Sequence, residues 1–130
     1  MSILGGRRNS QTKFVATYYF YMRLFDSYRY ERGRHKLNMA LLWDYRTDNF
    51  DWQKYRKTVV ERVVSMGRLS DWYAVFDLYG GISGVRRIAR DEVVDLSPRN
   101  LDFMCRALNI KLTETKCYRQ AQLRAAHLSC

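Results

Sequence analysis

The stretch FDWQKYRKTVVERVVSMGRLSDWYAVFDLYG, residues 50–80, decides the fold of the chain. Apolar residues recur in it every three or four positions, which is the spacing of one face of an α-helix. These residues are Trp52, Tyr55, Val59, Val63 and Met66 in the first half, and Trp72, Val75, Phe76 and Tyr79 in the second half. The pattern predicts two consecutive amphipathic helices, each opening with an Asp-Trp pair.

The residues between these two helices predict where one ends and the next begins. Gly67 suits the left-handed position that follows a helix C-terminus. Ser70 is a typical N-cap residue, and Asp71 places a negative charge at the positive end of the second helix. We therefore expect a tight corner at 67–70, and Gly80 should end the second helix.

Further helix signals follow towards the C-terminus. A shorter helix is predicted after Gly80-Gly81. Ser97-Pro98 is a clear start signal, because a capping hydroxyl precedes proline at the first helical position, and Asn109 suits the end of that helix. A last helix is expected from Thr113. The sequence therefore predicts an all-α domain, a small bundle of four to five short helices with an irregular N-terminal arm.

Large aromatic and branched side chains should form the core of this small bundle. Leu41, Leu42 and Trp43 are expected to pack against the two central helices. The predicted core residues are Trp43, Trp52, Tyr55, Val59, Val63, Trp72, Phe76, Tyr79, Leu101 and Leu108.

Charge is distributed unevenly along the chain. The net charge is +10, of which residues 1–38 carry +6, residues 39–109 carry +1 and residues 110–130 carry +3. We accordingly expect a basic, aromatic-rich arm at 1–38, a helical domain at 39–118 and a C-terminal helix or tail at 119–130. A basic flank binds phosphate or an acidic partner in some proteins and only improves solubility in others, and the sequence leaves both open.

The N-terminal arm has two parts. Residues 1–13 are polar and lack any period, which predicts disorder. Residues 14–30 are rich in aromatic and β-branched residues that fit a strand, yet their spacing also fits a helix, so both remain open. The abrupt change of composition at Met39 raises the hypothesis that translation starts there.

Residues that could act in catalysis or bind a metal are few and scattered. Cys105, Cys117 and Cys130 are widely spaced without a C-x-x-C pair, which is unlike a disulfide framework or a structural zinc site and typical of reduced cytoplasmic thiols. His35 and His127 have no partner at catalytic or metal-ligand spacing. We expect no catalytic residue, no cofactor, no metal and no membrane association.

Two weaker signals have structural interpretations. The loop GGISG, residues 80–84, lacks the Lys-Ser/Thr ending of a phosphate-binding loop and follows a predicted helix, so we interpret it as helix punctuation. Asp91, Glu92 and Asp95 form an acidic cluster, which we interpret as solvated loop carboxylates.

One alternative function rests on three arginines. The predicted helices 70–79 and 82–90 have the length of a helix-turn-helix unit, and the second should point Arg86, Arg87 and Arg90 outward. Gly84 weakens that helix, and the set lacks the amide side chains that read base edges. A DNA-binding regulator that uses this helix and the basic arm is the alternative hypothesis.

Six segments, taken together, resemble a known family. They are LLWDY at 41–45, DWQK at 51–54, VVERVVSMG at 59–67, DWYAVFDLYG at 71–80, LSPRNLDFMCRALNI at 96–110 and KCY at 116–118. Their order and spacing resemble a small bacterial domain family of unknown function. The resemblance covers residues 41–118, and the two flanks depart from it.

The resemblance has one functional implication. Members of that family look like the small partner of a nucleotidyltransferase-type toxin, which implies an antitoxin-like role. It carries over no catalytic motif. The leading hypothesis is therefore a non-enzymatic, cytoplasmic helical module that binds a protein partner.

Overall fold

The computed structural model describes residues 23–128, and this part of the chain is helical, without a strand. Its α-helices are α3 (Tyr28–Glu31), α4 (Arg56–Met66), α5 (Leu69–Leu78), α6 (Gly81–Asp91), α7 (Pro98–Leu108) and α8 (Lys116–Leu128), and its 3₁₀ helices are η1 (Met39–Leu42) and η2 (Leu112–Glu114). The predicted all-α bundle is confirmed, with the short α3 as an additional helix. The predictions for residues 1–22, for Cys130 and for the side chain of His127 fall outside the described residues.

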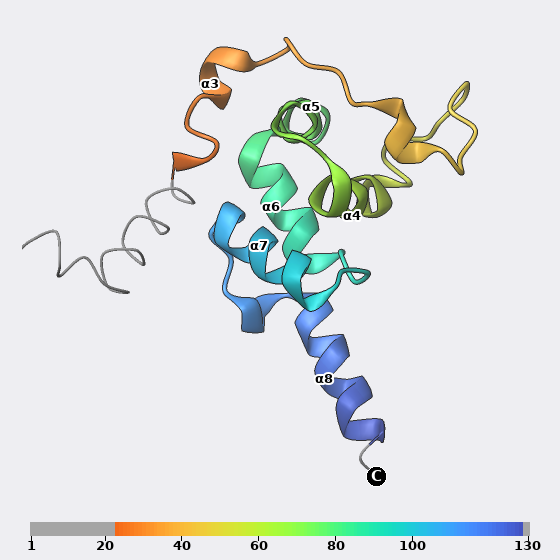
Figure 1. Cartoon of the computed structure of the whole chain (residues 1–130), viewed down its shortest axis with the longest axis vertical. Helices are drawn as coiled ribbons and strands as arrows, with labels where there is room; N and C mark the ends of the chain where they lie inside the picture. The colour runs from red at the N-terminus through yellow and green to blue at the C-terminus, as the bar shows by residue number, and fades with distance from the viewer. Residues whose placement is uncertain (1–22, 129–130) are drawn as a thin grey trace, which may run out of the picture.

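Helix α6 lies at the centre of the bundle. It contacts α4, α5, α7 and α8, whereas α8 contacts α6 and η2 and, through the Cys117 thiol, the Val94 carbonyl in the loop after α6. Figure 1 shows residues 23–43 arching over α5 to place η1 on the far side of the molecule, and it shows α8 projecting away from the bundle. The long N-terminal connection therefore covers the α4–α5 end, and α8 leaves the opposite end.

The local signals around α7 are confirmed. The Ser97 hydroxyl oxygen accepts a hydrogen bond from the Asn100 N–H at 3.2 Å, and Pro98 occupies the first helical position. Asn109 ends the helix in the left-handed conformation, with φ of 55°. These signals depend only on neighbours along the chain, so the sequence was sufficient to predict them.

The corner between α4 and α5 differs from its prediction. Gly67 is extended, with φ of −78°, and is not left-handed. A Cβ atom there would lie 2.7 Å from the Val63 carbonyl oxygen, so close packing excludes a side chain. Helix α5 begins at Leu69 with Arg68 as its N-cap, so the prediction of Ser70 as the cap was wrong.

The glycines after α5 do mark a helix boundary, as expected. Gly80 and Gly81 have φ values of 84° and 81°, a conformation that side chains disfavour. Gly84 lies within α6, where a Cβ atom would come within 1.7 Å of the Tyr79 carbonyl oxygen. Gly84 has a low helix propensity, but its lack of a side chain lets α5 and α6 approach each other at their corner.

The core begins before Met39. Phe25, Tyr28 and Leu37 are buried, and the Phe25 ring packs 5.0 Å from the Trp72 ring. The Tyr28 hydroxyl donates a hydrogen bond to the Asp77 carboxylate at 2.6 Å, and burial together with this bond raises the pKa of Tyr28 to about 12. Part of the segment assigned to the arm thus belongs to the domain, and α8 runs across the boundary placed at residues 118–119.

The predicted core residues divide into three groups. The buried ones are Val59, Val63, Trp72, Phe76, Tyr79, Leu101 and Leu108. Trp52 and Tyr55 are half-buried, because α4 begins only at Arg56 and both residues lie in the turn before it. Trp43 was predicted wrongly: its side chain is 78% exposed. The 3₁₀ helix η1 turns Leu41 and Leu42 onto the core and leaves the next residue facing solvent.

Candidate protein-binding surface

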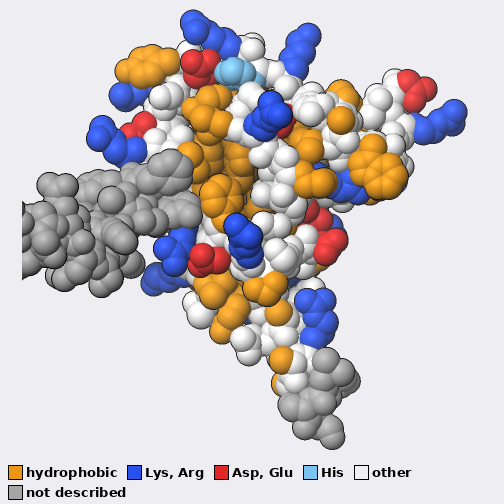
Figure 2. All heavy atoms as spheres, in the orientation of Figure 1, with side chains coloured by type: hydrophobic (Ala, Val, Ile, Leu, Met, Phe, Trp, Pro, Cys, Tyr) orange, Lys and Arg blue, Asp and Glu red, His pale blue; other side chains and the backbone are white. Residues whose placement is uncertain are grey.

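Large apolar side chains are exposed on the segments around the α4–α5 corner. They are Met39, Trp43, Met66 and Leu69, which we call the Trp43 platform. Met66 is 56% exposed, although its spacing placed it on the apolar face of the predicted helix. In Figure 2, apolar side chains reach the surface over the region that contains η1.

One arginine fastens η1 to α4. The Arg62 guanidinium donates to the Leu41 carbonyl at 2.8 Å and to both oxygens of the Asp44 carboxylate at 2.7 and 2.8 Å. The hydrogen bond from Arg62 lowers the pKa of Asp44. Because Met66 follows Arg62 by one helical turn on the same face, this clamp places Met66 beside the segment that carries Trp43.

One carboxylate fastens the start of η1 to the start of α5. Asp71 is buried, and its two oxygens accept the Asn38 N–H at 2.9 Å and the Arg68 N–H at 2.8 Å. Asn38 directly precedes Met39, and Arg68 directly precedes Leu69. The four platform residues therefore lie on segments that two charged side chains tie together.

A groove of about 540 Å³ adjoins the platform along α4. Its floor is one stripe of that helix, and two loops form its walls. The lining residues are Lys57, Thr58, Glu61, Arg62, Ser65 and Met66 on the floor, with Tyr45 on one side and Asp95 and Ser97 on the other. Met66 belongs both to the groove and to the platform, so the two features are continuous.

Some charged groups of the groove are already bonded within the protein, and others are not. Glu61 is buried, and one of its oxygens accepts the backbone N–H groups of Val94 and Asp95, both at 2.9 Å. This carboxylate holds the loop after α6 against α4. The Lys57 ammonium group, in contrast, forms no ion pair with another residue in the described part of the chain.

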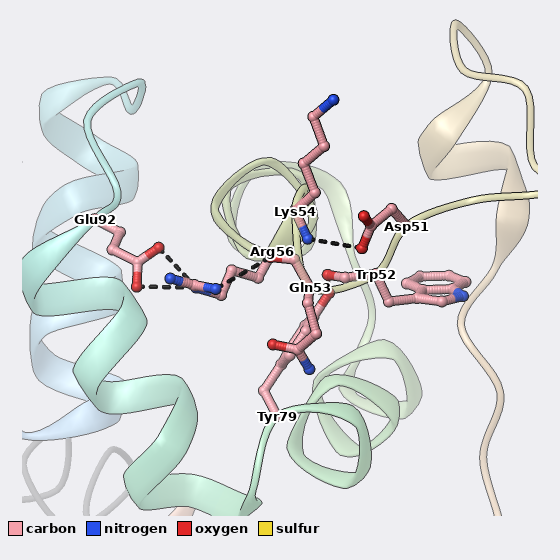
Figure 3. Close-up of polar contacts among 7 residues, drawn as sticks. All are labelled: Asp51, Trp52, Gln53, Lys54, Arg56, Tyr79 and Glu92. Carbon is pink, nitrogen blue, oxygen red and sulfur yellow. Dashed lines mark hydrogen bonds and ion pairs between the residues drawn. The ribbon is translucent and has the colours of Figure 1, made fainter.

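The polar contacts at the start of α4 hold this part of the chain against α5 and α6. Figure 3 shows Arg56 bridging to α6, with its Nε 2.8 and 3.0 Å from the two Glu92 oxygens. The Tyr79 hydroxyl donates to the Trp52 carbonyl at 2.8 Å, and burial raises the pKa of Tyr79 to about 12. The sequence suggested one cluster of solvated carboxylates at Asp91, Glu92 and Asp95. In the structure, two of them form ion pairs instead, Glu92 with Arg56 and Asp91 with Arg90.

The three arginines proposed as nucleic-acid contacts do not form one outward set. Arg86 is half-buried and donates to the Leu108 carbonyl at 2.7 Å, which caps the C-terminal end of α7. Arg90 pairs with Asp91 at 2.8 Å, and Arg87 is exposed. The expectation that Arg86 points outward was wrong, because the packing of α7 against α6 brings an acceptor to it.

The cysteine and histidine side chains have ordinary structural surroundings. Cys105 and Cys117 are buried and unpaired by disulfides, and burial raises the pKa of Cys105 to about 11. His35 lies 3.0 Å from a Glu31 oxygen and beside the Tyr73 ring. Among residues 23–128, no group of three or more His, Cys, Asp or Glu side chains is arranged to hold a metal ion.

The platform and the floor of the groove both fall within a segment that is similar to other proteins. Residues 37–89 match a family of unknown function, DUF6922. The DUF6922 segment contains η1, α4, α5 and most of α6, so a resemblance to such a family is confirmed. Residues 90–118, over which the resemblance was expected to continue, lie outside the match.

The other comparisons add no relative. The chain matches no curated protein and no solved structure. None of the helices in the described part combines the length and the hydrophobicity that crossing a bilayer requires.

Proposed function

We propose that this protein is a non-enzymatic helical module that binds a protein partner through the Trp43 platform. The exposure of Trp43 carries the proposal, because a large apolar surface on a small domain costs free energy unless a partner covers it. Trp, Met and Arg are enriched at protein interfaces, and Trp is a frequent binding hot spot. The platform combines an indole, two thioethers and a nearby guanidinium.

The partner class follows from the family resemblance. That resemblance implies a nucleotidyltransferase-type toxin as the partner and an antitoxin-like role for this chain in the bacterial cytoplasm. A rigid platform suits this role, because preorganised side chains lose little conformational entropy on binding. The clamps made by Arg62 and Asp71 supply that rigidity.

Co-purification from the native source tests the proposal. We expect a partner protein, identified by mass spectrometry, to be retained by the wild type and lost with Trp43→Ala. Trp43→Ala should change the free energy of unfolding by less than about 0.5 kcal/mol, because the side chain is exposed. Tyr30→Ala is the matched control, since Tyr30 is 66% exposed on α3 and lies outside the platform. Recovery of the wild type only as a lone monomer would contradict the proposal.

A further inference from the structure

We infer that the groove along α4 takes a segment of the partner that carries an apolar side chain for the Trp43 platform and a carboxylate for Lys57. The inference rests on the proposed function and extends it to the chemistry and direction of the bound segment. The observations behind it are the shape of the groove, its continuity with the platform and the distribution of its charges.

The shape of the groove favours a chain segment. Its floor runs along α4 from Lys57 to Met66, a distance of about 14 Å at the helical rise per residue. An extended peptide covers that distance in about four residues. Because Met66 also belongs to the platform, an apolar anchor at that end and a charged group at the Lys57 end would occupy one continuous surface.

The charges favour an acidic segment. The carboxylates of Asp44, Glu61 and Asp71 are already engaged by Arg62 or by backbone N–H groups. Lys57 in the groove and the exposed Arg46 and Arg68, which flank the platform residues in sequence, have no ion pair with another described residue.

The remaining charges of the region fit the same occupant. The chain carries +10, and most of this charge lies in the flanks outside residues 39–109, so it attracts an acidic partner over distance but does not make the groove itself positive. Asp95 is an exposed carboxylate on the groove wall, where a backbone N–H of the bound segment can donate to it. The groove therefore offers one cation for a side chain and one acceptor for a backbone group.

A displayed library of random peptides, selected against the full chain, tests the inference. We expect enriched peptides to share a large apolar residue and an Asp or Glu separated by about four positions. A synthetic copy of an enriched peptide should bind Trp43→Ala and Lys57→Glu at least about tenfold more weakly than the wild type. A copy with Lys in place of its acidic residue should prefer Lys57→Glu to the wild type.

Two further variants keep the test interpretable. Lys111→Glu is the matched control, because Lys111 is exposed beside η2 and away from the groove. The affinity of this variant for the peptide should stay within about twofold of that of the wild type. Lys57→Gln removes the charge without reversing it and should weaken binding as well, even if Lys57→Glu unfolds the protein. Circular dichroism checks the fold of each variant.

Several outcomes would overturn the inference. These are the absence of enriched peptides, enriched peptides without an acidic residue, binding that ignores both Lys57 variants, and enrichment of sequences from this chain, which would indicate a second copy. If the native partner depends on Trp43 but ignores Lys57→Gln, the proposed function stands and this inference fails. If no partner depends on Trp43, the proposed function itself fails.

Discussion

Asp51-Trp52 and Asp71-Trp72 are the same dipeptide near the start of successive helices, yet the structure uses them differently. Asp51 is exposed, and its carboxylate accepts one hydrogen bond, from the Lys54 N–H at 3.0 Å, within its own turn. Asp71 is buried in the first turn of α5 and accepts N–H groups from Arg68 and from the distant Asn38. The first carboxylate organises a turn, and the second joins two segments.

The two indoles differ in the same way. Trp52 is half-buried, and its nearest aromatic neighbour is Phe50, at 4.7 Å and two residues away. Trp72 is only 4% exposed, and it packs against three rings, Phe25 at 5.0 Å and Phe76 and Phe103 both at 6.1 Å. Phe25 and Phe103 lie far from Trp72 in the sequence, on either side of it. A shared motif therefore predicts a helix start, but only contacts from remote segments decide whether its side chains become core.

The largest expected effect comes from removing the two indoles separately. Trp72→Ala should lower the free energy of unfolding by about 3–5 kcal/mol, because it leaves a cavity among three rings. Trp52→Ala should cost about 1–2 kcal/mol, since much of that side chain already contacts water. Urea unfolding followed by circular dichroism measures both values. Equal losses would break the comparison between the two pairs.

A smaller difference is expected between the two carboxylates. Asp71→Ala leaves two N–H groups without their acceptor and should cost about 2–4 kcal/mol, while Asp51→Ala removes a single exposed hydrogen bond in the turn before α4, worth about 1 kcal/mol. Hydrogen exchange gives a sharper readout than stability alone. The amide protons of Asn38 and Arg68 should exchange faster in Asp71→Ala, and unchanged exchange at Asn38 would show that Asp71 does not hold that segment.

The smallest effect is expected where the two regions touch, at the hydrogen bond from Tyr79 to the Trp52 carbonyl. Tyr79→Phe should cost about 1 kcal/mol at neutral pH. The fold raises the pKa of Tyr79 from 10.0 to about 12, so the protonated hydroxyl is favoured in the folded state. Its contribution is therefore complete below pH 10 and declines as the pH rises towards 12.

Unfolding in urea at several pH values tests this dependence. The wild type should lose more stability than Tyr79→Phe between pH 10 and 12. Tyr28 has a pKa raised to about 12 as well, so the stability of Tyr79→Phe should still decline in part, and the double variant with Tyr28→Phe should decline less. Cys105 and Tyr73, whose pKa values are also raised, should leave some decline in the double variant. Identical pH profiles for the wild type and Tyr79→Phe would show that the Tyr79 hydroxyl is not held by the fold.

The accuracy of the sequence predictions varied with the range of the interactions behind them. Ser97, Pro98 and Asn109 were placed correctly because a cap or a helix end involves groups within a few residues. The role of Gly67 was mistaken because its reason is the approach of the Val63 carbonyl and not its φ angle. Arg86 was misjudged because its acceptor, the Leu108 carbonyl, lies on another helix.

Almost no signal in the sequence predicts the candidate surface. Trp43 follows two leucines that are buried, and an apolar run of this kind predicts burial for all of its members. Met66 likewise continues a regular helical stripe. The one available signal was the Asp-Arg clamp of Asp44 and Arg62, and no spacing rule pairs residues so far apart.

By itself, the sequence determined that the chain is all-α and where most of its helices lie, because helix period, caps and stops act over a few neighbouring residues. Only the tertiary structure decided which tryptophan is core and which is surface. That outcome depends on residues 23–42, which cross over α5, bring Phe25 to Trp72 and leave Trp43 on the outside. Burial is set by contacts between distant segments, and local composition does not encode it.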